Sequence, residues 1–408
     1  MVTLDDVRAA RERIGEVLQA TPCVRSDALS SRCDAAVHLK LESLQRTGSF
    51  KARGALNKLL QMSRAERDAG VIAASAGNHA QGVAFAAAEV GARARIVMPA
   101  TTPLVKVART REFGAEVDLF GDNFDEAYER ARELEREHGY SFVHPFDDPL
   151  IVAGQGTVGL ELLEQVPELG AVVVPIGGGG LIAGIAVAVK EQRPEVAVYG
   201  VQSEAAPSMQ VSLDAGHREE RKSAPSIAEG ISTKRPGELT FELTRKYADG
   251  VVVVSEAAIE GALFELLDVG KTLAEGAGAA AAAALLEGLL PELAGRRVAV
   301  LVSGANIDLG VLNRVIERSL ARHHRLVRLH IRVKDRPGGL AALLQVIARG
   351  EANILRIEHH RVFTDTSFWE TEVELTLETR DRGHIETLIA SLHEAGYQRV
   401  QEVRVPGQ

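Results

Sequence analysis

The sequence has few of the features that mark secreted, membrane-bound or metal-binding proteins. Cysteine occurs only at Cys23 and Cys33, too few for a disulfide framework and without metal-ligand spacing. No uncharged apolar run is long enough to cross a bilayer. The first residues, Met1 to Asp6, are acidic and lack the apolar segment of a signal peptide. These absences predict a cytoplasmic protein in a reducing compartment, without membrane contact.

An excess of basic charge is also absent. The chain carries 47 Lys and Arg against 56 Asp and Glu, and its net charge of -9 argues against a nucleic-acid partner. Aromatic residues make up 4% of the 408 residues, whereas glycine occurs 38 times. This composition is typical of an α/β protein with Ala-rich helices, and the length allows about two or three domains.

Buried-strand patterns alternate with helical patterns along most of the chain. From Gly70 the order is strand, glycine loop and helix, and a second such series begins after Val152. This alternation predicts two α/β lobes with parallel, doubly wound sheets, and ligands at the carboxyl ends of the strands. Strands are expected at residues 37–42, 71–74, 94–99, 116–120, 171–176, 196–201, 251–254 and 298–302.

The last part of the chain follows a different order. After Arg325 the pattern is βαββαβ, which predicts a separate ferredoxin-like domain of about 80 residues. The basic stretch 318–325 is expected to be the linker before it. The strands of the ferredoxin-like domain are expected at 326–333, 354–362, 370–377 and 398–403, and its helices at 340–348 and 385–395.

Lys51 is the first candidate for chemistry. It follows Phe50 at the junction of a loop and a helix, where burial would disfavour its ammonium form and make it a nucleophile and base. A solvated surface lysine is the more common outcome for such a window taken alone. The interpretation therefore depends on the glycine-rich loops that follow.

Four consecutive glycines, Gly177 to Gly180, form the clearest loop. They follow a buried strand and precede an apolar helix that begins at Leu181. Their backbone N–H groups can converge on an anion at the helix start. Because four glycines are entropically costly in a purely structural loop, the pattern favours a phosphate site.

Two further turns occupy similar strand ends. The loop from Ser75 to His79 can present N–H groups to a second anion such as a carboxylate, and Asn78 offers a neutral donor and acceptor. Ser303 follows the strand 298–302 and is expected to bring a hydroxyl to the cleft between the two lobes. An ordinary helix cap is the alternative for each turn.

Two motif matches are interpreted as coincidental. Residues 154–159 fit a dinucleotide-binding pattern, but no clear strand precedes them, and we expect a helix start where glycine allows close packing. Residues 270–272 look like the end of a P-loop, but Glu265 replaces its first glycine.

Four segments, in this order, carry a family resemblance: 48–55, 75–82, 177–180 and the Ser303 turn. They resemble the fold-type II pyridoxal-phosphate enzymes, most closely the threonine dehydratase (threonine ammonia-lyase) family and its serine dehydratase and serine racemase relatives. The similarity covers about the first 320 residues. The remainder resembles an ACT domain, whose typical first loop is matched by residues 335–340.

The resemblance implies an α/β architecture with two parts. A two-lobed, tryptophan synthase β-like catalytic domain would span 1–321, with a smaller lobe of about 48–145 inserted in the larger one. An ACT regulatory domain with the ferredoxin-like βαββαβ order would span 326–405.

The resemblance also implies roles for individual residues around the cofactor, pyridoxal 5'-phosphate. Lys51 is the catalytic residue and binds the cofactor as a Schiff base, with Phe50 beside the ring. Asn78 is expected to bond the ring hydroxyl, and Ser303 to meet the pyridine nitrogen. The phosphate-binding residues are Gly177, Gly178, Gly179, Gly180 and Leu181, and the substrate carboxylate is received by Ser75, Ala76, Gly77, Asn78 and His79.

Some positions depart from the family pattern. Ala305 stands where a second glycine is common after the serine. Glu204 matches the relatives' divalent-cation site, but Gln210 replaces an aspartate, so no metal is predicted. Ala76 stands where related racemases have a serine hydroxyl that serves the second face of Cα.

The implied activity is the conversion of L-threonine to 2-oxobutanoate and ammonia, with L-serine to pyruvate as a second reaction. A serine or 3-hydroxyaspartate dehydratase and a serine racemase stay open, as does an amino-acid sensor on an inactive scaffold, although the intact Lys51 argues against the sensor. The ACT domain implies regulation by isoleucine or valine. A homodimer or homotetramer is expected, and the role in isoleucine biosynthesis or in catabolism stays open.

Overall fold

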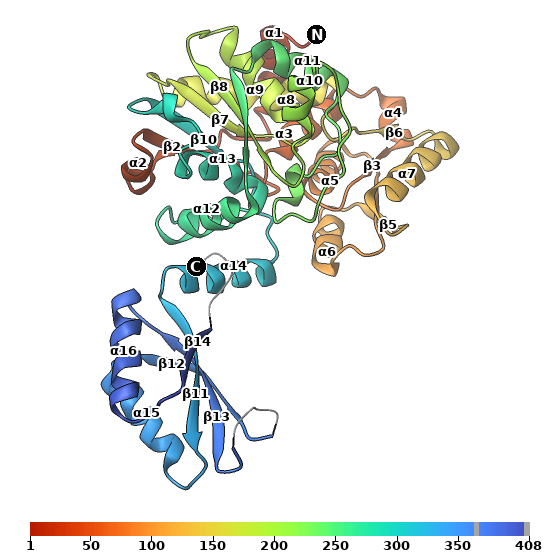
Figure 1. Ribbon diagram of the computed structural model, residues 1–408. Coiled ribbons are helices and arrows are strands. Elements are labelled where there is room, and N and C mark those ends of the chain that lie inside the picture. The colour runs from red at the N-terminus through yellow and green to blue at the C-terminus, as the bar shows by residue number, and fades with distance from the viewer. Residues whose placement is uncertain (363–366, 404–408) are drawn as a thin grey trace. The chain divides into compact units, whose positions relative to one another are not determined.

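The structure, a computed structural model, describes residues 1–362 and 367–403. The chain divides into two units, Met1–Ile307 and Asp308–Gln408. The first unit consists of two α/β lobes (Figure 1). In the described part of the chain, no helix combines the length and the apolar character needed to span a membrane.

The larger lobe is built on a six-stranded sheet in the order β1-β2-β10-β7-β8-β9. Only β1 runs antiparallel to its neighbour β2. The central strands are buried on both faces, which explains their continuous apolar runs. The strands are β1 (Cys23–Arg25), β2 (Ala36–Leu41), β7 (Ala171–Pro175), β8 (Ala197–Ser203), β9 (Gly250–Val254) and β10 (Arg297–Val302).

Helices cover both faces of this sheet, as the alternating pattern predicts. They are α1 (Leu4–Ile14), α2 (Asp27–Cys33), α8 (Pro149–Gln165), α9 (Gly180–Lys190), α10 (Ser208–Ala215), α11 (Glu238–Tyr247), α12 (Glu256–Asp268) and α13 (Gly276–Leu286). Short 3-10 turns are η1 (Glu42–Leu44), η2 (Glu229–Ile231) and η3 (Pro291–Leu293).

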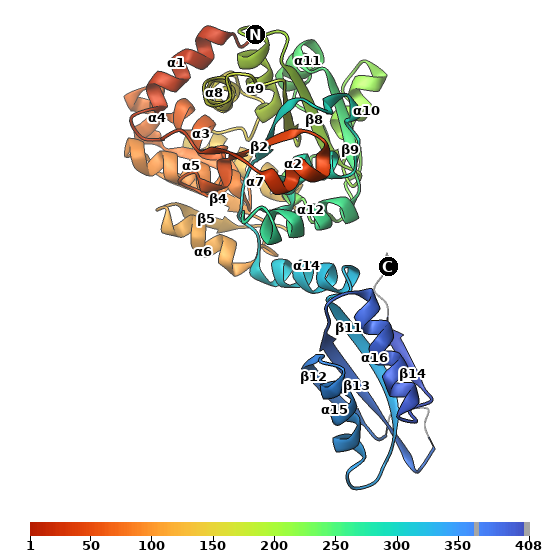
Figure 2. The ribbon, with the colours of Figure 1, turned by 90° about the vertical axis from the view of Figure 1, so that its left-hand side faces the viewer.

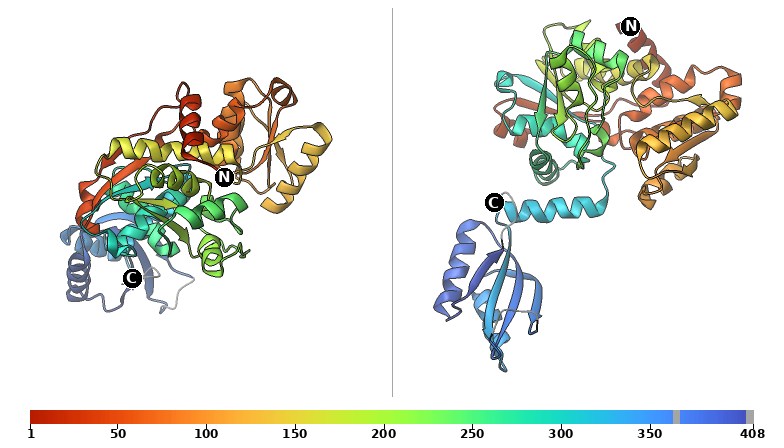
Figure 3. Two further views of the ribbon diagram at one scale, coloured as in Figure 1. Left: turned by 90° about the horizontal axis from the view of Figure 1, so that it is seen from above. Right: turned by 45° about the vertical axis from the view of Figure 1, so that its right-hand side comes forward.

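The smaller lobe has a parallel four-stranded sheet in the order β5-β4-β3-β6. Both panels of Figure 3 show its orange segments to one side of the green larger lobe. Its elements are β3 (Val71–Ala74), β4 (Ala94–Met98), β5 (Glu116–Leu119), β6 (Ser141–Phe142), α4 (Arg64–Ala69), α5 (Asn78–Val90), α6 (Leu104–Glu112) and α7 (Phe124–His138).

Helix α3 (Lys51–Leu60) joins the two lobes. Its apolar face, including Ala52 and Leu56, shares one core with Val83 of α5 and with Ile151 of α8. Figure 2 shows α3 beside α5 on one side of the unit. The first residue of this helix therefore lies where the two lobes meet.

The glycine pattern at 154–159 lies inside α8, so the expectation that it starts a helix is wrong. The helix begins earlier because the Asp148 side chain accepts hydrogen bonds from the N–H groups of Leu150 and Ile151. The close packing expected at these glycines is present. A Cβ atom at Gly154 would lie 2.6 Å from the Cα of Gly54 in α3.

The second unit has an antiparallel sheet in the order β12-β13-β11-β14, with α15 and α16 on one face (Figure 1). This is the predicted ferredoxin-like arrangement. Residues 404 and 405 of the predicted ACT domain, and 363–366 within it, lie outside the described residues. Its elements are α14 (Leu309–Arg322), β11 (Leu326–Lys334), α15 (Gly339–Arg349), β12 (Asn353–His360), β13 (Glu370–Glu378), α16 (Arg382–Glu394) and β14 (Val400–Val403).

The predicted linker 318–325 is helical over most of its length. Helix α14 continues to Arg322 because its amphipathic spacing buries Val315 and Ser319 on one side. Only a short turn follows, in which His324 adopts a φ of 58°. Basic composition alone was a poor guide here, since a helix surface carries the same charges.

Candidate active site

A cavity of about 550 Å³ lies within the first unit, lined by residues of both lobes. The start of α3, the loops that follow β3 and β7, and Ser303 after β10 all contribute to its wall. Small-molecule and cofactor sites commonly have volumes of roughly 300–1,000 Å³. The cavity is therefore large enough for a cofactor together with a small substrate.

Lys51 is the first residue of α3 and lines this cavity. Its Nζ donates a hydrogen bond to the carbonyl oxygen of Pro145 (2.8 Å) and lies 5.2 Å from the centroid of the Phe50 ring. Desolvation by the surrounding protein lowers the pKa of Lys51 to about 8, although the Glu275 carboxylate opposes the shift. A much larger fraction of this amine is neutral near pH 8 than for a solvated lysine, as a nucleophile or base requires.

The four glycines form a tight loop at the start of α9. Among the described residues, no acceptor is found for the backbone N–H groups of residues 177–181. Gly179 adopts a φ of 97°, and a Cβ at Gly178 would lie 2.3 Å from the Phe146 ring. The loop therefore needs glycine, and its free N–H groups fit a phosphate.

The Ser75–His79 loop faces the same cavity at the start of α5. Ser75 Oγ accepts a hydrogen bond from the N–H of Gly77 (3.2 Å). His79 Nε2 donates to the carbonyl oxygen of Val143 (2.8 Å), and burial lowers the pKa of His79 to about 3, so its ring is neutral. The His79 side chain therefore anchors the loop to Val143, the residue that follows β6. Its Nε2 is hydrogen-bonded within the protein.

Asn78 is held by two partners that the sequence analysis did not single out. Its Nδ2 donates to Glu275 Oε1 (2.5 Å), and its Oδ1 accepts from Asn306 Nδ2 (2.7 Å). Burial raises the pKa of Glu275 to about 7, against the hydrogen bond from Asn78. Glu275 precedes a helix start, where an acidic residue is common, so its sequence context gave no signal of this role.

Ser303 is buried at the end of β10 and lines the cavity. Its carbonyl oxygen accepts a hydrogen bond from the N–H of Phe50 (3.1 Å), and Ser49 forms a β-bridge with Gly304. These backbone contacts fix the serine turn directly against the segment that leads into Lys51. The structure thus brings the four sequence motifs together around one cavity.

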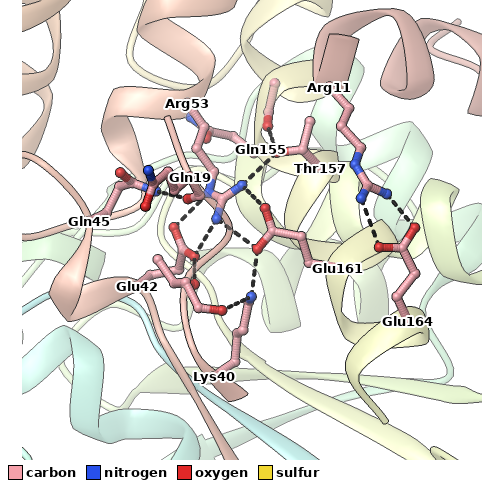
Figure 4. Close-up of polar contacts among 12 residues, drawn as sticks. Arg11, Gln19, Lys40, Glu42, Gln45, Arg53, Gln155, Thr157, Glu161 and Glu164 are labelled. Carbon is pink, nitrogen blue, oxygen red and sulfur yellow. Dashed lines mark hydrogen bonds and ion pairs between the residues drawn. The ribbon is translucent and has the colours of Figure 1, made fainter. Parts of the chain in front are cut away.

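A buried network of charges surrounds Arg53, two residues after Lys51 (Figure 4). Arg53 Nε donates to Glu42 Oε2 (2.7 Å), and Nη1 donates to Glu161 Oε1 (2.5 Å) and Thr157 Oγ1 (3.0 Å). Its Nη2 reaches both carboxylates, so all five guanidinium N–H groups have partners.

Lys40 completes this network from β2. Its Nζ donates to Glu161 Oε2 (2.5 Å), to the carbonyl oxygen of Thr21 and to Gln165. Burial alone would raise the pKa of Glu42, but the Arg53 guanidinium holds it below its usual range. Two positive and two negative side chains therefore tie α3 to β2 and α8, and fix the helix that begins with Lys51.

Glu204 and Gln210, the two positions compared above with a divalent-cation site, make other contacts. Gln210 Nε2 donates to Asp214 Oδ1 (2.9 Å), and Glu204 Oε1 accepts from the N–H of Glu256 (3.0 Å). Across residues 1–362 and 367–403, no group of three or more His, Cys, Asp or Glu side chains is placed to hold a metal ion.

The two lobes, the desolvated lysine and the free N–H groups of the glycine loop define the class: an α/β enzyme with room for a phosphorylated cofactor. A family profile described as "Pyridoxal-phosphate dependent enzyme" matches residues 15–304, and an ACT domain profile matches residues 323–404. The chain belongs to the pyridoxal-phosphate-dependent enzymes, and pyridoxal phosphate is its cofactor. This confirms the predicted family, fold class and cofactor.

Named relatives are similar over most or all of the chain. An L-threonine ammonia-lyase of Thermotoga maritima is 46% identical over 407 residues, which cover 100% of both chains. A catabolic L-threonine dehydratase of Escherichia coli K12 is 44% identical over 315 residues, 77% of this chain and 96% of the relative. The processed form of threonine deaminase isoform 2 from Solanum lycopersicum has a TM-score of 0.74 at 39% identity, over 77% of this chain and 86% of that one.

Proposed function

We propose that this enzyme converts L-threonine to 2-oxobutanoate and ammonia, with L-serine to pyruvate as a second reaction. The observation that carries the proposal is the position of Lys51, which lines the cavity between the two lobes and has a pKa lowered to about 8. The name of the full-length relative from Thermotoga maritima supports L-threonine as the first substrate to test.

Each part of the cavity has a task in this reaction. Pyridoxal phosphate, when bound, supplies an aldehyde for the substrate amine and a ring that accepts electrons from the Cα–H bond. Lys51, as a neutral amine, takes the proton from Cα. The N–H groups at 177–181 would hold the phosphate, and the Ser75–His79 loop would receive the substrate carboxylate at the N–H groups that have no partner within the described protein, those of Ala76, Asn78 and His79.

Ser303 bears on which reaction occurs. Its hydroxyl is a neutral partner for the ring nitrogen, whereas a carboxylate would hold that nitrogen protonated and strengthen the ring as an electron acceptor. A weaker acceptor favours rapid loss of the β-hydroxyl over a long-lived carbanion. This supports β-elimination as a reaction of the site, whereas the choice between elimination and racemisation depends on the second face of Cα, at Ala76.

Regulation is the second part of the proposal. The second unit carries the Asp335-Arg336-Pro337-Gly338-Gly339 turn at the start of α15, and isoleucine or valine is the effector proposed for this unit. The active form is proposed to be a homodimer or homotetramer in the cytoplasm.

A keto-acid assay tests both parts. The holoenzyme is incubated with L-threonine, L-serine or 3-hydroxyaspartate, each with and without isoleucine or valine, and apoprotein serves as the control. The expected result is cofactor-dependent 2-oxobutanoate from L-threonine, with a rate that one branched-chain amino acid changes. A preference for 3-hydroxyaspartate, or no keto acid from L-threonine, would overturn the assignment of the substrate.

A further inference from the structure

His144 is a cavity residue without a part in the reaction described above. It follows β6, at the carboxyl end of the sheet in the smaller lobe, and lines the same cavity as Lys51. Its ring packs edge-on against Phe146 (centroids 4.8 Å apart, 87° between planes) and lies 6.4 Å from the Phe142 ring. These contacts hold the imidazole in one orientation.

Hydrogen bonds fix which nitrogen of His144 carries the proton. The backbone N–H groups of Phe146 (3.3 Å) and Asp147 (2.8 Å) both donate to Nδ1. Since Nδ1 accepts, the single proton of the neutral ring lies on Nε2. Burial lowers the pKa of His144 to about 4, with Asp147 opposing the shift and Lys51 adding to it. The ring is therefore neutral at physiological pH.

The Nε2–H group of His144 is a hydrogen-bond donor that is available to a ligand. Among the described residues no hydrogen-bond partner of Nε2 is found, although the residue lines the cavity. The preceding residue, Val143, accepts the hydrogen bond from His79 at the end of the Ser75–His79 loop. His144 therefore lies beside the Ser75–His79 loop, whose residues line the same cavity.

We propose that His144 Nε2–H donates a hydrogen bond to the substrate carboxylate, next to the N–H groups of the Ser75–His79 loop. The inference rests on the proposed function in one respect, that the substrate is an α-amino acid. A neutral donor suits this place because it binds the carboxylate without a positive charge that would oppose proton uptake by Lys51.

Two substitutions separate this role from a purely structural one. In His144→Asn the side-chain oxygen can replace Nδ1 and keep the hydrogen bonds from Phe146 and Asp147, but the donor at the Nε2 position is lost. In His144→Gln the amide can reach the Nε2 position and donate, but the acceptor at the Nδ1 position is lost. Each variant therefore keeps the hydrogen-bonding function of the imidazole that the other variant loses.

The holoenzyme is titrated with L-2-aminobutyrate, which has no leaving group, and with its carboxamide, and binding is followed by the visible absorbance of the cofactor. KM and kcat for L-threonine are measured in parallel. In His144→Asn the Kd for L-2-aminobutyrate and the KM for L-threonine should rise about 10- to 100-fold, the range for a hydrogen bond to a charged group. The carboxamide should be affected much less, kcat should change less than KM, and His144→Gln should lie closer to the wild type.

Several outcomes would overturn the proposal. They are a larger defect in His144→Gln than in His144→Asn, equal weakening of both ligands, loss of cofactor from His144→Asn, or no binding of either ligand by the wild type. Failure of the proposed function is distinguishable from these. A wild type that binds L-2-aminobutyrate but forms no keto acid from L-threonine would contradict the dehydratase assignment and leave the His144 comparison valid.

Discussion

Asn78 Nδ2 donates a hydrogen bond of 2.5 Å to Glu275 Oε1, and this bond joins the start of α5 in the smaller lobe to the start of α13 in the larger one. Because Asn306 occupies Asn78 Oδ1, the amide has a fixed orientation and keeps one Nδ2 hydrogen for a ligand. The predicted bond from Asn78 to the ring hydroxyl would use that hydrogen.

Glu275 should make the stability of the apoprotein depend on pH. Burial raises its pKa from 4.5 to about 7, so between these values the folded protein holds a proton that the unfolded chain has lost. The free energy of unfolding should therefore fall as pH rises through this window. Glu275→Gln removes this loss, and its stability relative to the wild type should grow between pH 5 and pH 8 by at most about 3 kcal/mol. Urea unfolding at several pH values measures the difference, and a difference independent of pH would contradict the raised pKa.

Lys51→Ala should abolish nearly all keto-acid formation. In the proposed mechanism the substitution removes both the covalent attachment of the cofactor and the base for the Cα proton, so a loss of at least about 1,000-fold in kcat is expected. The visible absorbance of the bound cofactor should weaken as well. Lys271→Ala, at an exposed position outside the cavity, is the matched control and should behave as the wild type. Substantial turnover by Lys51→Ala would remove this lysine from the mechanism.

A chain ended near Arg322 should keep lyase activity and lose its response to an effector. Both lobes and every residue of the cavity precede this position. The E. coli relative, matched over 96% of its length by 315 residues of this chain, makes such a length reasonable. Keto-acid rates with and without isoleucine or valine provide the measurement. A truncated enzyme that still responds would locate the effector site in the first unit.

Ala76→Ser should increase racemisation of serine. Racemisation needs proton transfer on both faces of Cα, and in the proposed mechanism Lys51 serves one of them. Ala76 lines the cavity with a methyl group, which can neither give nor take a proton. Chiral chromatography of serine after incubation should find little D-serine with the wild type and more with the variant. Abundant D-serine from the wild type would instead favour a racemase.

Arg53→Leu should destabilise the protein far more than Arg11→Leu. Arg53 is 1% exposed, and its loss leaves the Glu42 and Glu161 carboxylates buried without their partner, which costs about 3–5 kcal/mol. Arg11 pairs with Glu164 near the surface (Figure 4), and such a pair contributes about 0–1 kcal/mol. Chemical denaturation of both variants gives the comparison. Similar stability changes would mean that water reaches the buried network.

Much of the fold was predictable because local patterns encode it. Apolar strands, glycine loops and helical spacing identified both lobes, and the position of Lys51 at a helix start followed from its neighbours. Contacts between distant residues were not predictable in this way. Asn78 and Glu275 are hydrogen-bonded although they lie 197 positions apart in the sequence, and no pattern near either residue predicts the other as its partner. His144 follows the two-residue strand β6, which is too short to stand out in the sequence, so its place at the cavity could not be predicted.

The saturated network of Lys40, Glu42, Arg53 and Glu161 restricts how this enzyme can be redesigned. Libraries that vary one of these positions at a time should find each nearly immutable, since any single change leaves a buried charge unmatched. Exchanges of oppositely charged pairs for apolar residues of similar volume should be tolerated better. Directed evolution of this scaffold should therefore randomise the four positions together.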